Sequence, residues 1–170
     1  MSVIFPKMYS SINSKPISRK EYIAEDGSNV VEESFKDGTQ VRKDKGRLGN
    51  IETESIEIHS DKMSKAAVVR TDLSTGLKTE TFFRTVPSDD GNGYGICKEE
   101  HKFFADGREL ITTTESRYDK NGTQLHSTTN ECLRNLNNMN APAFYRNYQV
   151  ADGKIVNENS GYTPANSFNA

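Results

Sequence analysis

The sequence predicts an all-β protein, an antiparallel meander of about eight or nine strands, with an up-and-down barrel favoured over a curled sandwich or an open sheet. Five Asp-Gly or Asn-Gly dipeptides stand between strand-like segments, and such dipeptides are the strongest local signal for a tight hairpin. The segments between the turns are rich in Thr, Val, Ile and Phe. Because the links are short, neighbouring strands are expected to be antiparallel, since a parallel pair needs a long crossover.

The first two hairpins are expected around Asp26-Gly27 and Asp37-Gly38. A two-residue type I′ turn at the first would place Ile23 opposite Val30, two apolar partners. The segment Ser18–Glu21 also matches a helical capping box, and the apolar match favours a strand there. The same turn type at the second site pairs opposite charges, Glu33 with Arg42 and Glu32 with Lys43. The two hairpins therefore form one continuous meander.

The middle of the chain continues this pattern of strands and short links. Lys65–Asp72 and Leu77–Val86 are joined by four residues that suit a hairpin loop. A further hairpin is expected around Asp152-Gly153, between Ala143–Ala151 and Lys154–Glu158. The remaining predicted strands of this region are Ile51–His59, Cys97–Ala105, Arg108–Lys120 and Thr123–Glu131.

Strand alternation also predicts which side chains share a face of the sheet. With two-residue turns at Asp106-Gly107 and Asn121-Gly122, one moderately apolar face is expected to carry Phe103, Leu110, Tyr118 and Leu125, and Phe104 lies on the opposite face. Thin apolar faces of this kind suit a sheet with one buried side. The residues singled out as candidates for ligand binding or for an interface are Phe103, Phe104, Leu110, Tyr118 and Leu125.

The predicted domain organisation is simple. The length of 170 residues suits one domain. We expect a flexible leader over residues 1–17, a single all-β domain over residues 18–159, and a loose tail over residues 160–170. The leader is rich in Ser, Lys and Asn, and the tail is rich in Asn with few charges.

Charge and hydropathy exclude several classes of protein. The chain has 22 basic and 24 acidic residues, and its net charge is −2, which argues against nucleic acid as a partner. No apolar run is long enough for a transmembrane helix. The N-terminus lacks the pattern of a secretory signal peptide, and Cys97 and Cys132 do not make a disulfide framework. We therefore expect a cytoplasmic protein, with export without a cleaved signal as the alternative.

The sequence indicates no catalytic, cofactor-binding or metal-binding residues. His59, His101 and His126 lack the spacing of a zinc site. Cys97 and His101 would lie on one face of a strand but about 13 Å apart, too far for a nucleophile and its base. The Gly-rich segment from Ser88 to Gly95 has no following Lys-Ser/Thr pair, so it does not match a phosphate-binding loop.

These observations lead to three functional hypotheses. The first is a non-enzymatic protein-interaction module that oligomerises through its sheet edges or faces. The second is a carrier of a small apolar ligand, built as a calycin-like up-and-down barrel. The third is an exported microbial effector or surface protein, suggested by the leader and the Asn-rich tail.

Overall fold

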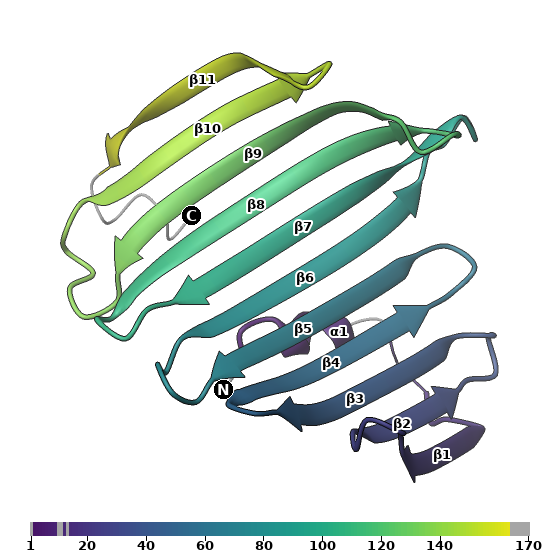
Figure 1. Cartoon of the computed structure of the whole chain (residues 1–170). Coiled ribbons are helices and arrows are strands. Elements are labelled where there is room, and N and C mark those ends of the chain that lie inside the picture. The colour runs from purple at the N-terminus through teal and green to yellow at the C-terminus, as the bar shows by residue number, and fades with distance from the viewer. Residues whose placement is uncertain (1, 10–11, 13, 164–170) are drawn as a thin grey trace. The chain divides into compact units, whose positions relative to one another are not determined.

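The computed structural model describes residues 2–9, 12 and 14–163. The chain divides into two compact units, Met1–Val86 and Pro87–Ala170, which are called the first unit and the second unit below. Both consist of antiparallel strands joined by short hairpin connections (Figure 1). The all-β, antiparallel prediction is confirmed. Among the described residues no helix is long and apolar enough to cross a membrane.

The first unit contains one short helix and six strands in sequential order. Each strand hydrogen-bonds to the preceding one in an antiparallel ladder. The elements are α1 (Phe5–Tyr9), β1 (Ser18–Ile23), β2 (Asn29–Ser34), β3 (Gln40–Leu48), β4 (Ile51–His59), β5 (Ser64–Asp72) and β6 (Lys78–Pro87).

The second unit contains five strands, again in sequential and antiparallel order. The strands are β7 (Gly93–Phe103), β8 (Arg108–Asp119), β9 (Gln124–Asn135), β10 (Ala143–Ala151) and β11 (Lys154–Thr163). The last hairpin, expected around Asp152-Gly153, is present, and β11 includes four residues that the sequence assigned to the loose tail.

Two parts of the predicted architecture are wrong. The described residues form eleven strands rather than eight or nine, and the sheet is not closed into a barrel. Among the described residues, β1 pairs only with β2, and β11 pairs only with β10. Closure needs hydrogen bonds between the first and last strands, and a series of hairpins specifies only the pairing of neighbours.

Four of the hairpin turns are of a different type from the one predicted, and this changes the pairing of their strands. At Gly27, Gly38, Gly107 and Gly122 only the glycine has a positive φ, between 84° and 85°. In the first of these turns the Ala24 amide donates to the Ser28 carbonyl, so three residues lie between the paired positions instead of two. This is a type I turn followed by a left-handed glycine, which forms a bulge. The Asp26 carboxylate accepts a hydrogen bond from the Ser28 amide and stabilises this turn type.

The extra residue shifts the register by one position. Tyr22 lies opposite Val30, and Ile23 lies opposite Asn29, not opposite Val30 as predicted. The charge pairs shift in the same way, so that Glu32 lies opposite Arg42. Only the turn at residues 152–153 has positive φ at both positions, 50° and 70°, and there the predicted type I′ geometry is confirmed.

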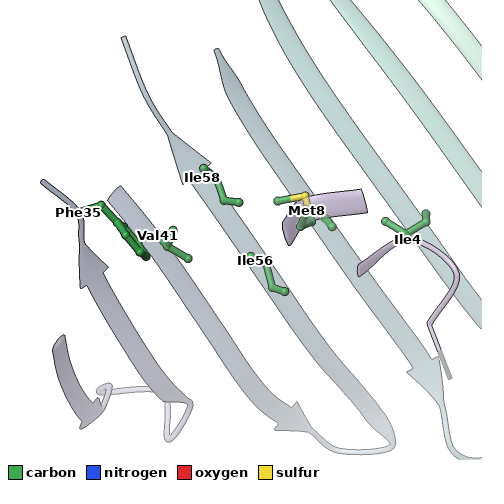
Figure 2. Packing of buried hydrophobic residues seen from close by; sticks show 7 residues of the cluster. Ile4, Met8, Phe35, Val41, Ile56 and Ile58 are labelled. Atoms are coloured by element: carbon green, nitrogen blue, oxygen red, sulfur yellow. The ribbon is translucent and has the colours of Figure 1, made fainter. Parts of the chain in front are cut away.

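A hydrophobic core lies on one face of the first unit. Met8 and Ile4 are fully buried and belong to the same buried cluster as Ile56 and Ile58. Figure 2 shows Met8 beside Ile56 and Ile58, with Ile4 farther along the sheet. Helix α1 contacts β4 and β5. The segment expected as a leader thus contributes two of the buried side chains of this unit. The complete buried cluster is Ile4, Met8, Phe35, Val41, Ile56, Ile58 and Ala67.

Glu80 anchors this N-terminal segment to the sheet. Its side chain on β6 is fully buried. One carboxylate oxygen accepts hydrogen bonds from the amides of Val3 and Ile4, at 2.8 and 3.2 Å, and the other lies 2.5 Å from the Lys78 ammonium. Burial alone would raise the pKa of Glu80, but the bonds from Lys78 and Val3 outweigh it and lower the pKa. The buried carboxylate of Glu80 therefore attaches the N-terminal segment, which covers part of one face of the sheet, to β6.

Candidate functional site

The sheet of the second unit is a single layer. Its described part consists of β7–β11 only, and all five strands are hydrogen-bonded side by side (Figure 1). Of the hydrophobic residues that are buried in the described chain, Ala143 alone belongs to this unit. Among the described residues of this unit, no helix or second sheet lies over either face. This exposed layer is the candidate functional site.

The register assigns the side chains of this layer to two faces. Phe103 lies opposite Glu109, and Lys102 lies opposite Leu110. The face that carries Glu99, His101, Phe103, Glu109 and Arg134 is called the charged face. The opposite face is called the aromatic face, and it carries Tyr94, Leu110, Tyr118, Leu133, Phe144, Tyr148 and Tyr162.

The four candidate residues predicted to share one face do not share it. Phe103 lies on the charged face, whereas Leu110 and Tyr118 lie on the aromatic face with the parity of Phe104. Leu125 falls at a register shift in the β8–β9 pairing and is exposed. The reason is the bulged turn at Gly107, because a slip of one residue moves a whole strand's side chains to the other face. Their role as interface residues stays a prediction.

A buried ionic cluster occupies one end of the charged face. His101 and Glu109 are both buried, and the Nδ1 of His101 lies 2.6 Å from a Glu109 oxygen. The Nε2 of His101 lies 2.7 Å from Glu99, and the Nε of Arg134 donates to the second Glu109 oxygen at 2.6 Å. The cluster therefore links three adjacent strands, β7, β8 and β9.

In this cluster His101 and Glu109 each favour the ionised form of the other. The hydrogen bond to Glu109, followed by that to Glu99, raises the pKa of His101 from 6.5 to about 9. Burial would raise the pKa of Glu109, but the hydrogen bonds from His101 and Arg134 lower it instead. At neutral pH the cluster holds two cations and two carboxylates. The ring of Phe103 stacks on His101 with 6.1 Å between centroids.

Next to this cluster the charged face is hollowed. The hollow has a volume of about 450 Å³ and is open to solvent. Its lining combines apolar, amide and hydroxyl groups with the Cys132 thiol, whose pKa is raised by burial. The lining residues are Ile111, Thr113, Asn130, Glu131, Cys132, Arg134, Tyr145, Asn147 and Thr163.

The aromatic face carries ring pairs across neighbouring strands. Tyr94 and Tyr118 stack with centroids 5.1 Å apart, and Phe144 meets Tyr162 edge-on at 5.5 Å. The guanidinium of Arg146 lies 4.8 Å from the centre of the Tyr148 ring. Arg146 also donates to Glu158 on β11 at 2.7 Å. Such exposed rings with polar ends are typical of surfaces that contact protein.

The structure does not bring together the cysteines and histidines that the sequence offered for catalysis or metal binding. Cys97 and Cys132 lie on the same face, but β8 separates their strands and they form no disulfide with each other. His59 belongs to the first unit, and its Nε2 lies 3.7 Å from a Glu57 oxygen. Within the described part of the chain, no three His, Cys, Asp or Glu side chains are grouped as metal ligands would be.

The ionic cluster is the feature that sequence reasoning missed. Glu99 and His101 are two residues apart on one strand, a visible signal of a shared face. Glu109 joins them only through the bulged turn, because a two-residue turn would have placed it on the opposite face.

Comparison with known proteins does not assign this layer to a family. No protein-family model matches the chain, no curated protein matches it in sequence, and no solved structure matches it in fold. The functional argument therefore depends on the geometry of the second unit.

Proposed function

We propose that this protein is a non-enzymatic interaction module that forms homo-oligomers through the sheet of its second unit. The observation that carries the proposal is the single layer itself. Within the described part of that unit, neither face of β7–β11 has a second layer over it. A stable sheet normally buries at least one face against another layer, so a second chain is the simplest source of that layer or of an extension of the sheet.

The side chains of the aromatic face support this proposal. Tyr118, Phe144 and Tyr148 are half-buried, and Tyr162 is exposed. Tyrosine is enriched at protein interfaces because its ring is rigid and apolar while its hydroxyl remains hydrated. An arrangement of rings on an otherwise open sheet suits a contact that forms between folded chains.

The ionic cluster supports a structural role over a catalytic one. Both ring nitrogens of His101 face carboxylates, and its pKa is raised to about 9. A general base near neutral pH needs an available nitrogen and a pKa close to the working pH. Arg134 is likewise engaged by Glu109. The cluster therefore acts as a cross-strand connection in a sheet that lacks an apolar core.

The ligand-carrier hypothesis loses its structural premise. It required the enclosed lumen of a barrel, and the sheet is open. A cytoplasmic location, with export without a cleaved signal as the alternative, stays a prediction from the sequence.

Light scattering coupled to size-exclusion chromatography tests self-association of the full chain. The expected mass exceeds the monomer value and rises with concentration. Amide hydrogen exchange at low and high concentration should then show added protection in β7–β11 and little change in β1–β6. A monomer at every concentration up to the high micromolar range would contradict the proposal, as would added protection confined to the first unit.

A further inference from the structure

The hollow on the charged face is lined by polar side chains that have no partner among the described residues. Thr113, Asn130 and Asn147 lie side by side on β8, β9 and β10. No hydrogen bond joins any of these three side chains to another described residue. The hydroxyl oxygen of Thr163, which also lines the hollow, is buried and equally unpartnered in the described chain. A buried polar atom without a partner costs free energy that a ligand group can recover.

A second row of side chains gives the hollow an apolar side. Ile111, Cys132 and Tyr145 are aligned across the same three strands. Gly161 lies opposite Tyr145 on β11, and a Cβ atom at this glycine would lie 3.0 Å from the Tyr145 hydroxyl and 3.2 Å from two carbons of its ring. The Tyr145 side chain therefore extends over Gly161, toward β11. The small Cys132 side chain leaves the space between Tyr145 and Ile111 unfilled.

The charges around the hollow favour an uncharged ligand. Arg134 lines the hollow from the charged face, and its Nε donates to Glu109 at 2.6 Å. Glu131 also borders the hollow, but the register places its side chain on the aromatic face, where its carboxylate lies 3.9 Å from the Arg146 guanidinium. Both charges thus have an opposite charge beside them. A charged ligand would gain little attraction here and would lose its hydration.

We infer that the hollow binds a neutral carbohydrate, as a single sugar residue or the end of a short oligosaccharide. Each hydroxyl group of a sugar donates one hydrogen bond and accepts others, and the amides of Asn130 and Asn147 likewise offer donors and acceptors. The C–H groups on the face of a sugar ring pack against apolar and aromatic side chains, which the row of Ile111, Cys132 and Tyr145 supplies. The volume of about 450 Å³ lies within the range of small-molecule sites, roughly 300–1,000 Å³.

Two other classes of ligand fit the hollow less well. An anion would find the Arg134 guanidinium already bound by Glu109. An extended peptide is recognised mainly through the free main-chain groups of a strand edge, whereas the main-chain groups of β8, β9 and β10 below the hollow pair with one another. The carbohydrate site goes beyond the proposed self-association and does not depend on it, because the rings that support that contact lie on the aromatic face.

Ligand-detected NMR on the full chain tests binding and the chemical class of the ligand. Saturation-transfer difference spectra are recorded with glucose, galactose, mannose and N-acetylglucosamine, each at about 5 mM, which largely occupies a site with a millimolar dissociation constant. At least one of these sugars is expected to bind. Acetate and methyl phosphate are the anionic controls, and N-acetylalaninamide is the peptide control. If no sugar binds, or if a control compound binds as tightly as the best sugar, the inference is overturned.

The Cys132 thiol reports whether the sugar occupies the hollow. Alkylation of Cys132 and Cys97 by iodoacetamide is measured separately, by mass spectrometry of the digested chain. A bound sugar should slow the alkylation of Cys132 about threefold or more at the same concentration. The rate at Cys97, which does not line the hollow, should stay unchanged. Equal Cys132 rates with and without sugar would place the binding elsewhere and overturn the inference.

Matched variants on the charged face test the two rows. Asn130→Ala removes an exposed amide of the hollow and should raise the dissociation constant of the sugar about fivefold or more. Asn157→Ala removes an exposed amide of the same face outside the hollow and should change the dissociation constant by less than about twofold.

Cys132→Leu tests the apolar row, because the larger side chain fills the space beside Ile111 and should abolish the NMR signal by steric exclusion. Circular dichroism checks that each variant keeps the parent fold. If Cys132→Leu fails to fold, Asn130→Ala decides alone. Parent affinity in Asn130→Ala, or in a folded Cys132→Leu, would overturn the inference.

Discussion

The two units stabilise an antiparallel sheet in different ways. Both are antiparallel sheets of consecutive hairpins, but the first unit has an N-terminal segment, including α1, that buries Ile4 and Met8 against its sheet. The second unit has no such cover within its described residues, and its most buried side chains include His101 and Glu109. One sheet is stabilised by apolar burial, the other by ionic and hydrogen-bonding links between strands.

This difference bears on function. A covered face is no longer accessible to another molecule, whereas an uncovered sheet retains two faces and an edge for contacts. The strand β1 of the first unit carries three charged residues in succession among its six residues, whereas β11 of the second unit carries two charged residues among its ten. The unit with fewer buried apolar side chains is thus the one that we propose to bind a second chain.

The largest expected effect on stability comes from truncating one apolar side chain in each unit. Ile56→Ala removes a side chain that is 3% exposed in the first unit, and it should lower the free energy of unfolding by about 4 kcal/mol. Leu110→Ala in the half-buried layer of the second unit should cost about 1 kcal/mol. Urea unfolding followed by circular dichroism measures both. Equal losses would mean that the two sheets are stabilised alike.

The next test breaks the ionic cluster. Glu109→Gln leaves His101 and Arg134 without a charged partner on β8, and it should cost about 3 kcal/mol because the site is buried. Glu115→Gln lies on the same strand and face but is exposed, and its effect should stay within about 0.5 kcal/mol. Urea unfolding again provides the measurement. A neutral result for Glu109→Gln would contradict the role of the cluster.

The cluster also predicts a pH dependence. The pKa of His101 is raised from 6.5 to about 9 in the folded protein, so the folded state retains a proton that the unfolded state releases. The stabilisation that His101 contributes should therefore be fully present below pH 6.5. The free energy of unfolding should then fall by about 2 kcal/mol as the pH rises to 9, after allowance for solvent screening. His101→Gln should abolish this fall. A parent stability that is constant or rising over this window would exclude the ionic interpretation.

The smallest expected effect is a difference in stability between variants of two bulged turns. Gly38 and Gly107 both have φ +85°, so alanine at either position should cost about 1 kcal/mol of backbone strain. At Gly38 a Cβ would meet nothing within 4 Å, whereas at Gly107 it would overlap the Asn137 side chain. Gly107→Ala should therefore cost about 1 kcal/mol more than Gly38→Ala. Thermal unfolding of the two variants measures the difference, and identical values would show that Asn137 adapts without loss.

Local features of the fold were accessible from the sequence. Asp-Gly and Asn-Gly dipeptides mark turns because glycine adopts positive φ without strain, and all five predicted turns are present. The short links then determine antiparallel neighbours. The turn at Asp152-Gly153 has the predicted geometry at both residues.

The faces of the candidate site were less accessible because the same dipeptide fits two turn types. At Asp106-Gly107 the type I turn with a bulge and the type I′ turn differ by one residue, and that residue decides whether Phe103 lies opposite Glu109 or Leu110. The choice depends on which strand pairing gives the better contacts across the sheet. Here the pairing brings Glu109 to His101 and Arg134.

By itself, the sequence determined the all-β class, the turn positions and the antiparallel order, because these follow from backbone preferences over a few residues. Only the tertiary structure decided the register of four hairpins, the open sheet, the cover of α1 over the first unit, and the ionic cluster of the second. Each of these depends on contacts between residues far apart in the chain, such as Ile4 with Glu80 and Glu109 with Arg134. Such contacts are selected by the free energy of the whole arrangement, which no local pattern encodes.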